Sequence, residues 1–191
     1  MSEPLQPSSN LEKAQKIEAP ITYPYIYSET ELSNLVENCS AIEPELRTIR
    51  GSSMSGVAEA GDIVDIYFGY YSCYPVTRND LIIYKHPAHK TPIFKMVKGV
   101  PGDSFALQKN NNVWNIMLNG EVLRNNKGNP YIMRGNRHKM LEIYVNDFKG
   151  LIPPTAYLVL GNTPSGSLDS TRFGLIDKKN FIGKVVRVIH Q

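Results

Sequence analysis

Two adjacent hydroxyl side chains stand in a short glycine-flanked segment, Arg50-Gly-Ser-Ser-Met-Ser-Gly. Glycine on either side permits a tight turn, which can present a serine hydroxyl and leave backbone N–H groups free to face an oxyanion. Gly/Ser-rich segments of this kind are also common in ordinary loops. Taken alone, the segment is a candidate nucleophile turn, but a plain surface loop is the commoner role of such a composition.

A lysine is embedded among apolar residues in the segment Ile93-Phe-Lys-Met-Val-Lys. In an extended chain Lys95 shares one face with Ile93 and Val97. If that face points inward, burial disfavours the ammonium form and lowers the pKa of Lys95. A neutral lysine can accept the proton of a serine hydroxyl. The alternative is a lysine on an edge strand whose amine reaches solvent.

Two further segments contain residues that could support such chemistry. Gly99-Val-Pro-Gly-Asp follows the lysine segment and on its own predicts only a turn. The segment from Leu160 to Gly174 is rich in hydroxyls and contains one acid and one arginine, a composition typical of a solvated loop. His86-Pro-Ala-His89 offers two imidazoles without a third ligand at metal spacing, so we predict no metal site.

The elements that must position these residues are mostly short strands. A polar arm is expected over residues 1–20 and one β-rich domain over 21–191. Ser28 followed by Glu31 predicts the N-terminus of a helix with Leu32, Leu35 and Val36 on one face, and no other segment predicts a helix. The predicted strands are Ile63–Phe68, Leu81–Lys85, Ile93–Lys98, Val113–Leu118, Leu141–Val145, Ala156–Leu160 and Phe181–Ile189.

Many short strands without intervening helices predict an all-β fold, an antiparallel barrel or sandwich with one N-terminal helix. Asn119-Gly120 between two apolar runs predicts a hairpin, because both residues tolerate the positive φ of a type I′ turn. The stretch Arg124–Arg137 is too polar for a core, and we expect a small exposed excursion at about 120–140.

Composition excludes several classes of protein. The 191 residues carry 20% charged and 41% hydrophobic side chains, as in a folded globular chain. A net charge of +3 without a Lys/Arg cluster gives no reason to expect nucleic acid as a partner. Cys39 and Cys73 can form one disulfide or none. The chain has no apolar run of 18 residues and no secretory h-region in residues 1–20, so we expect neither a membrane span nor a signal.

The order and spacing of these segments resemble the boxes of the type I signal peptidases, which are Ser/Lys serine proteases. In that family a Gly-x-Ser-Met box carries the nucleophile and a Lys-(Arg)-x-x-Gly-x-Pro-Gly-Asp box carries the general base. A third box, Gly-Asp-Asn-x-x-x-Ser-x-Asp-Ser-Arg, supplies a hydroxyl that orients the lysine and an acid that braces the site. Here residues 51–54 match the nucleophile box, 95–103 the lysine box and 161–170 the third box. The likeness runs from about Arg50 to Val188.

The resemblance implies a serine endopeptidase that processes exported or pilin-type precursor proteins and needs no metal or organic cofactor. The implied roles are nucleophile for Ser53, general base for Lys95, orienting hydroxyl for Ser167, bracing acid for Asp169, backbone oxyanion donors for Ser52 and Ser53, and substrate contact for Met54. The partner would be an extended peptide segment of a precursor, docked as an added strand. A membrane surface is a further partner implied by the family. The location is membrane-associated by resemblance, with a soluble cytoplasmic form as the alternative.

The chain departs from the family pattern at several positions. The basic residue after the lysine is Met96, and the serine two places before the nucleophile is Gly51. Thr171 takes the place of the arginine that ends the third box, two positions after the aspartate, and Arg172 comes one step late. A bulge of one residue could restore a pair between Asp169 and Arg172.

Two alternatives stay open at this point. One is a self-cleaving repressor-type peptidase, which shares the Ser-Met box and the lysine strand but would need a cleavable bond near its own N-terminus. No Ala-Gly or Cys-Gly pair precedes Ser53, and no DNA-binding helix-turn-helix is evident. The other alternative is a non-catalytic peptide-binding module on the same fold, a hypothesis prompted by the departures from the boxes.

Overall fold

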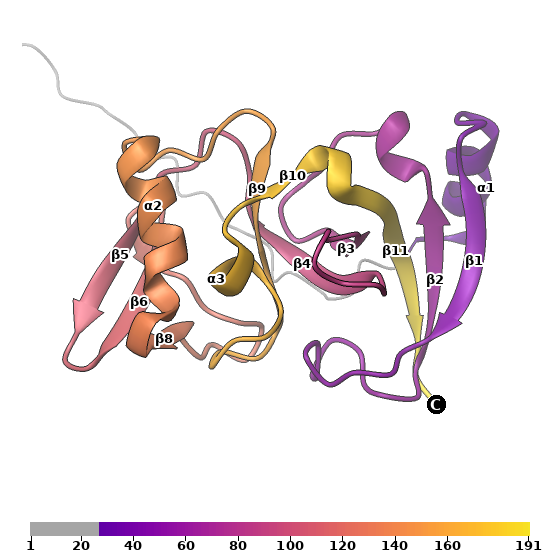
Figure 1. Cartoon of the computed structure of the whole chain (residues 1–191). Coiled ribbons are helices and arrows are strands. Elements are labelled where there is room, and N and C mark those ends of the chain that lie inside the picture. The colour runs from indigo at the N-terminus through magenta and orange to yellow at the C-terminus, as the bar shows by residue number, and fades with distance from the viewer. Residues whose placement is uncertain (1–26) are drawn as a thin grey trace, which may run out of the picture.

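A seven-stranded antiparallel sheet forms the larger half of the computed structural model, which describes residues 27–191 (Figure 1). The arm predicted over residues 1–20 lies outside the described residues. In sheet order the strands are β1 (Glu43–Thr48), β2 (Ile63–Phe68), β11 (Phe181–Ile189), β3 (Leu81–Tyr84), β4 (Ile93–Gly99), β9 (Ala156–Leu160) and β10 (Ile176–Asp177). Because β4 lies between β3 and β9, residues on β4 are held from both sides.

A second, four-stranded antiparallel sheet is inserted in the chain between β4 and β9, which pair with each other. Its strands are β5 (Phe105–Asn110), β6 (Val113–Leu118), β7 (Glu121–Val122) and β8 (Ile132–Arg134), and β6 pairs with the other three. We call residues 105–147, which comprise this sheet and the helix α2 (Lys139–Asp147), the insert; it forms the left half of Figure 1. The hairpin between β6 and β7 has Asn119 at φ 50° and Gly120 at φ 85°, as a type I′ turn requires.

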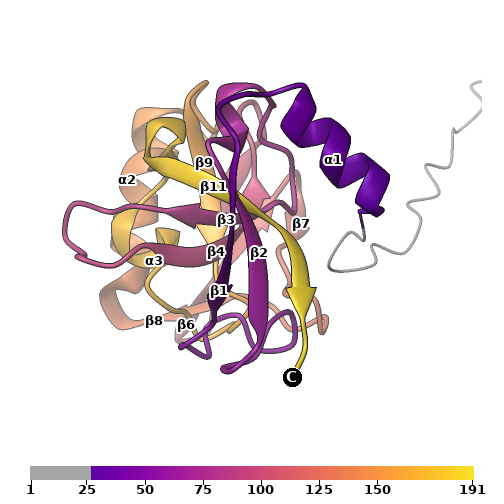
Figure 2. The same ribbon diagram turned by 90° about the vertical axis from the view of Figure 1, so that its right-hand side faces the viewer.

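The N-terminal helix α1 (Glu29–Glu37) begins where the sequence predicts. The Ser28 hydroxyl accepts a hydrogen bond from the Glu31 backbone N–H at 3.2 Å, and the Glu31 carboxylate accepts one from the Ser28 N–H at 2.7 Å. This capping box satisfies two N–H groups that an isolated helix end leaves unpaired. The helix lies on the outside of the large sheet (Figure 2). Its Leu32 is buried in the same cluster as Ile82 of β3 and Val97 of β4.

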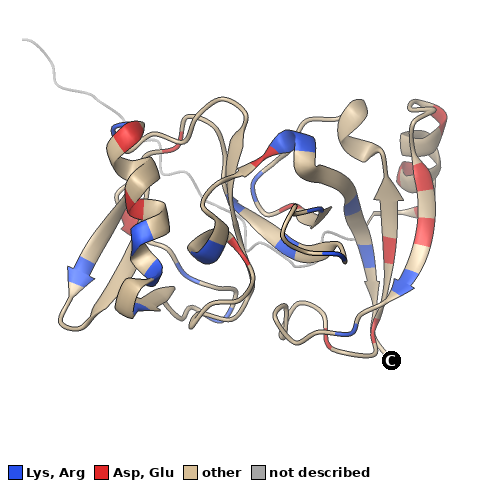
Figure 3. Cartoon of the chain, viewed as in Figure 1, with Lys and Arg blue, Asp and Glu red and all other residues tan. Residues whose placement is uncertain are grey.

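Two links fix α1 to the large sheet. The Arg187 guanidinium on β11 pairs with Glu29 at 2.7 Å and with Asp65 on β2 at 3.2 Å, in a region where acidic residues of α1, β1 and β2 face basic residues of β11 (Figure 3). Cys39, just after the helix, forms a disulfide with Cys73, which follows the 3-10 turn η1 (Tyr70–Ser72). The sequence left open one bridge or none, and the structure contains the bridge.

The prediction of a mostly β, antiparallel fold is confirmed, but the prediction of a single helix is wrong. Residues Leu141–Val145, predicted as a strand, lie within α2. Leu141, Tyr144 and Val145 pack into the insert's core, and this i, i+3, i+4 spacing marks one helix face. A third helix, α3 (Ser170–Phe173), and the 3-10 turns η2 (Gly135–His138) and η3 (Lys178–Asn180) complete the described elements.

The insert has a core that it shares with the large sheet. Leu158 and Leu160 of β9 are fully buried in the same cluster as Met133 of β8 and Leu141 of α2. Tyr131, inside the stretch expected to be an exposed excursion, is also buried in this cluster. The part of the stretch around Tyr131 and Met133 is therefore packed against the fold, because β8 pairs with β6, whereas residues 126–129 and 134–136 are exposed.

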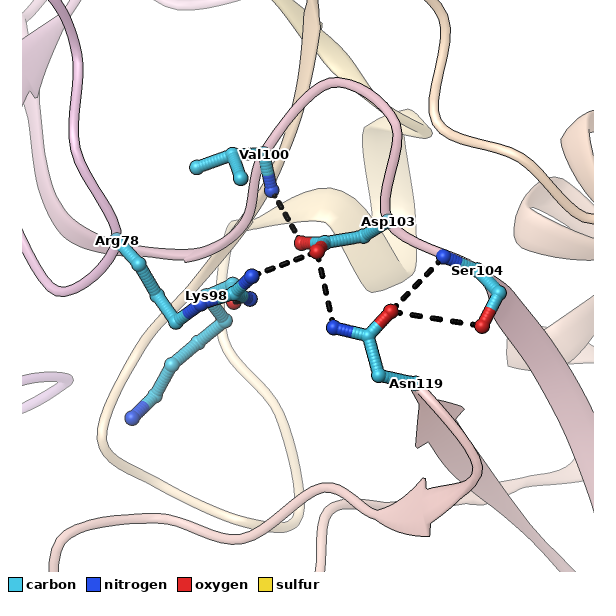
Figure 4. A network of polar contacts seen from close by, with 6 residues as sticks. All are labelled: Arg78, Lys98, Val100, Asp103, Ser104 and Asn119. Atoms are coloured by element: carbon cyan, nitrogen blue, oxygen red, sulfur yellow. Dashed lines mark hydrogen bonds and ion pairs between the residues drawn. The ribbon is translucent and has the colours of Figure 1, made fainter. Parts of the chain in front are cut away.

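Asp103 at the end of the lysine box forms the centre of a joint between the two sheets (Figure 4). Its carboxylate accepts hydrogen bonds from Arg78 at 2.6 Å, Asn119 at 2.9 Å and the Val100 N–H at 2.8 Å. Burial raises the pKa of the Asp103 carboxyl, but the bonds from Arg78 and Asn119 outweigh it and hold the pKa below its usual value. Arg78 also donates to the Lys98 carbonyl oxygen at 2.7 Å. The turn after β4 is thus fixed to the loop before β3 and to the hairpin of the insert.

Within residues 27–191, no helix has the length and apolar character needed to cross a bilayer.

Candidate active site

The nucleophile box forms a compact turn between β1 and β2. The Ser55 N–H donates to the Ser52 carbonyl oxygen at 3.1 Å, and the Val57 N–H donates to the Met54 carbonyl oxygen at 2.9 Å. Gly56 has φ 86°, a conformation that favours glycine. The Met54 side chain is buried among apolar residues and anchors the turn in the core. Ser53, one residue earlier, keeps part of its surface exposed.

Ser53 and Lys95 are in direct contact. Lys95 Nζ donates to Ser53 Oγ at 2.6 Å and to the Phe94 carbonyl oxygen at 2.7 Å. Lys95 is paired in register with Ile82 on β3 and is only 3% exposed. The strand thus delivers the amine from the sheet interior to the serine hydroxyl, 42 positions earlier in the chain.

The surroundings of Lys95 favour its neutral form. Burial lowers the pKa of Lys95 to about 8, and the nearby Asp169 carboxylate opposes this shift without cancelling it. Lys98 on the same strand is also buried, and burial together with the Arg78 charge lowers its pKa to about 8. The lysine whose contact with the Ser53 hydroxyl the structure shows is Lys95.

The third box places an acid at the centre of a hydroxyl loop. Asp169 has no solvent exposure. Its Oδ2 accepts hydrogen bonds from the Ser167 hydroxyl at 2.6 Å and from the Gly161 N–H at 3.1 Å, and its Oδ1 accepts from the Thr171 hydroxyl at 2.6 Å. Asp169 also caps α3 through the Thr171 N–H. The expected hydrogen bond between Ser167 and Lys95 is not among those formed; Ser167 Oγ is bound to Asp169 instead.

Ser53, Gly161 and Ser167 converge at one point. A methyl group on Gly161 would lie 2.5 Å from Ser167 Oγ and 2.7 Å from the Ser53 carbonyl oxygen. Only glycine leaves room for this approach, because a Cβ does not come within 3 Å of such atoms without displacing them. The Ser167 hydroxyl, which was expected to orient the lysine, therefore lies beside the Ser53 turn and is bonded to Asp169.

The arginine that supports the third box comes from the insert. Arg172 is exposed, and within residues 27–191 it forms no ion pair with Asp169. The restoration of that pair by a bulge is therefore not observed. Arg137, at the end of the polar stretch 124–137, instead donates to the Thr171 hydroxyl at 2.6 Å and to the Ser167 carbonyl oxygen at 3.3 Å. Arg137 could not be predicted as a site residue, because nothing in the sequence around it indicates a contact with Thr171, 34 positions later.

Two further residues support the site. Ser170 is fully buried, and its hydroxyl accepts the Val159 N–H of β9 at 2.9 Å, which fixes α3 to the sheet. Asn162 is 3% exposed and contacts the nucleophile turn. Asn162 lies within the third box, and its position in that box is the feature of the sequence that could have identified it as a site residue. Ser52, an expected oxyanion donor, is exposed on the turn.

An antiparallel β scaffold that brings a serine hydroxyl against a buried lysine has the arrangement of a serine peptidase with a lysine base. Comparison with known proteins gives the same class. Residues 38–190 match the family described as signal peptidase, peptidase S26. The chain belongs to this family, and the expectation from its boxes is confirmed.

Two curated relatives agree with this assignment. The chain is 29% identical over 149 residues to signal peptidase IB of Staphylococcus aureus (strain COL), covering 72% of this chain and 73% of the relative. It is 30% identical over 145 residues to signal peptidase I of Bacillus caldolyticus, covering 72% and 74%. A crystal structure of a signal peptidase I from Enterococcus faecalis V583 matches 59% of this chain and 97% of that chain, with a TM-score of 0.40 and 20% identity.

Proposed function

We propose that the chain cleaves exported precursor proteins by a dyad of Ser53 and Lys95, with Ser53 as the nucleophile and Lys95 as the general base. The observation that carries this proposal is the 2.6 Å contact between Lys95 Nζ and Ser53 Oγ, made by a lysine that is 3% exposed. A buried amine with a pKa of about 8 is neutral in a useful fraction of molecules near neutral pH.

In the first step, Ser53 Oγ attacks the carbonyl carbon of the scissile peptide bond. The Oγ–H bond breaks, its proton passes to the lone pair of Lys95 Nζ, and the carbonyl oxygen becomes an oxyanion. The Ser53 N–H is the proposed oxyanion donor, with Ser52 beside it. Because the Ser52 carbonyl accepts from the Ser55 N–H, the trans peptide unit directs the Ser53 N–H away from the turn interior.

In the second step, the C–N bond breaks and the Lys95 ammonium returns its proton to the leaving amine. This leaves an acyl group on Ser53 and a neutral lysine. Water then attacks the ester carbonyl carbon, and Lys95 accepts a proton from that water. As the second tetrahedral intermediate collapses, the bond between the carbonyl carbon and Ser53 Oγ breaks and the Lys95 ammonium returns the proton to Oγ. The carboxylic acid product leaves and loses its own proton to solvent, so the hydroxyl and the neutral lysine are both restored. In this scheme Ser167 and Asp169 fix the loop of the third box, which lies beside the Ser53 turn.

The proposed substrate is an extended peptide segment with small side chains before the cut, from an exported or pilin-type precursor. Such a segment can dock as an added strand beside a β scaffold. The Cys39–Cys73 bridge supports work in an oxidising compartment, because disulfides persist there and are rare where thiols are kept reduced.

A serine-directed phosphonate probe and a peptide with a small-residue cleavage site test the proposal. Wild type and Ser52→Ala should react with the probe and cleave the peptide, whereas Ser53→Ala should do neither. Loss of one hydroxyl in a turn costs little stability, so the melting temperature of Ser53→Ala should stay near that of wild type. Reversed results for the two serines would move the nucleophile to Ser52.

The same preparation separates the two alternatives. A self-cleaving peptidase would convert purified protein into two bands on a gel during incubation at alkaline pH, and a precursor peptidase leaves its own domain intact. A non-catalytic binding module would bind the peptide but fail to react with the probe at any pH. Either of these results would overturn the proposal.

A further inference from the structure

Asn162 connects the nucleophile turn to the insert through its side chain and its backbone. Its backbone N–H donates to the Ser53 carbonyl oxygen at 2.8 Å, and its side-chain amide donates to the Ser55 carbonyl oxygen at 2.7 Å. On the other side, its carbonyl oxygen accepts from the Asn125 amide at 2.9 Å, and its Oδ1 accepts from the Asn126 N–H at 3.1 Å. Each hydrogen-bonding group of this buried residue therefore has a partner.

Asn126 extends the connection to the end of the turn. Its side-chain amide donates to the Gly56 carbonyl oxygen at 2.8 Å, and its Oδ1 accepts from the Asn162 side chain. The two asparagines thus hold three carbonyl groups of the nucleophile turn, at Ser53, Ser55 and Gly56. We call this arrangement the asparagine bridge: Asn162 and Asn126 with the carbonyls that they bind.

The bridge fixes the orientation of the peptide groups next to the nucleophile. In a trans peptide unit the C=O and the following N–H point in opposite directions. Holding the Ser53 carbonyl toward Asn162 therefore fixes the peptide plane that follows the nucleophile and, through the shared Cα, the direction of the Cα–Cβ bond that carries Oγ. A nucleophile that must meet both a carbonyl carbon and Lys95 loses rate when it is displaced, by up to about 100-fold for a displacement of about 1 Å.

We propose that Asn126 and Asn162 are positioning residues for the peptidase reaction, acting through the backbone of the Ser53 turn. This inference rests on the proposed function. It also gives a role to the polar stretch around residues 124–130, whose composition alone predicted only an exposed excursion. The chain has a neutral amide at position 162, where the family box has an acid, and a neutral Met96 where the family has a basic residue.

An amide and a carboxylate are not equivalent at this place. An aspartate at position 162 could not donate to the Ser55 carbonyl oxygen and would place an unpaired charge in a site that is 3% exposed. Asn162→Asp is thus a nearly isosteric substitution that tests the buried part of the bridge, because it removes the side-chain donor to Ser55. Since such a change can also impair folding, the exposed Asn126 provides the primary variant.

The experiment compares Asn126→Ala with Asn129→Ala. Asn129 lies on the same turn and is exposed, and its described hydrogen bonds are those of its backbone. Asn126→Ala removes two bonds of the bridge, and we expect kcat to fall about 5- to 30-fold with KM within about twofold. The midpoint of the pH profile should not move, because Lys95 keeps its surroundings. Asn129→Ala should match wild type.

Hydrogen–deuterium exchange of residues 50–58 gives a readout that needs no activity. Asn126→Ala and Asn162→Asp should speed exchange in this segment, and Asn129→Ala should not. In the double variant Asn126→Ala/Asn162→Asp, the activation free energy should rise by less than the sum of the rises in the two single variants, because both substitutions act on one bridge. Unchanged exchange in Asn126→Ala, or a kcat that falls only with the melting temperature, would overturn the proposal.

The two proposals can fail separately. If wild type neither reacts with the phosphonate probe nor cleaves the peptide, the proposed function fails, and the exchange measurement still decides whether the bridge orders the turn. If wild type is active and Asn126→Ala retains full kcat, the bridge has no positioning role.

Discussion

Arg137 and Thr171 are joined by a 2.6 Å hydrogen bond between a guanidinium nitrogen and a hydroxyl oxygen, across 34 positions of sequence. The same hydroxyl donates to Asp169 at 2.6 Å. A charge-bearing group of the insert is thereby connected through one hydroxyl to the buried acid of the third box. The hydroxyl spacer allows Arg137 to support the loop from a distance that a direct ion pair would not span.

Arg137→Ala should lower kcat about tenfold to a hundredfold, because a hydrogen bond from a charged group contributes about 1.5–3 kcal/mol and each 1.4 kcal/mol corresponds to a factor of ten. Arg137→Lys should recover part of the loss, since lysine keeps the charge without the planar fork. Steady-state kinetics with a cleavable peptide measure both effects. Arg172→Ala is the matched control, and an equal loss there would place the supporting arginine at 172.

Activity should depend on the neutral form of Lys95. With a pKa of about 8, the neutral fraction is about 10% at pH 7 and about 90% at pH 9. kcat/KM should therefore rise with pH through a single group near pH 8 and level off above it. A rate profile from pH 5 to 10 checks this expectation.

Two variants identify the group that titrates. Lys95→Arg should be inactive, because a guanidinium is not deprotonated in this pH range. Lys98→Met should retain the same rise near pH 8, although the pKa of Lys98 is lowered to about 8 as well. Loss of the rise in Lys98→Met, or activity in Lys95→Arg, would exclude Lys95 as the base.

The titration of Lys98 should make the free energy of unfolding depend on pH. Burial lowers its pKa in the folded state to about 8, below the ordinary value of about 10.4 in an unfolded chain. Between these values the unfolded chain binds more protons, so the free energy of unfolding rises with pH across this window. Relative to wild type, Lys98→Met should lose about 2 kcal/mol of this rise between pH 7 and pH 9.5. Urea unfolding at the two pH values measures this difference. If the free energy of unfolding rises equally with pH in both proteins, Lys98 is charged in the folded state.

Gly161→Ala should abolish cleavage. The added methyl group would meet Ser167 Oγ at 2.5 Å and the Ser53 carbonyl oxygen at 2.7 Å, so the two sides of the site would have to separate. Gly120→Ala is a suitable comparison for folding, because a methyl group there meets no atom within 4 Å and its cost is confined to the hairpin. Probe labelling and thermal melting should show an unreactive but folded Gly161→Ala; full reactivity would mean that the third box moves freely.

Local patterns were sufficient to predict several strands of the two sheets. The ranges Ile63–Phe68, Val113–Leu118, Ala156–Leu160 and Phe181–Ile189 coincide with strands, because runs of β-branched and apolar residues end at clear turn signals. The strand β1 was not predicted: its sequence, Glu-Pro-Glu-Leu-Arg-Thr, is exposed throughout, and only its pairing with β2 makes it a strand. Residues 141–145 were assigned the wrong period for a related reason, since their β-branched and aromatic residues favour a strand and tertiary packing makes them helical.

The site divides in the same way. The contact between Ser53 and Lys95 could be predicted because each residue lies in a specific box, and the alternation of residues 93–97 put the lysine on the inner face. The contacts of the supporting residues Arg137 and Asn126 could not be predicted, because a polar loop has no hydrophobic periodicity that indicates which way its side chains point. Met54, expected to contact substrate, has its side chain in the core, so any contact it makes would use its backbone. That role stays a prediction.

The insert is placed in the chain like a module that evolution could exchange. It leaves from β4 and returns to β9, and these two strands pair with each other. Here the module contributes Asn126 to one side of the dyad and Arg137 to the other. A chimera that carries a relative's insert on this large sheet should therefore fold with its dyad misaligned, and grafting these two side chains together should be the shortest route to a working hybrid.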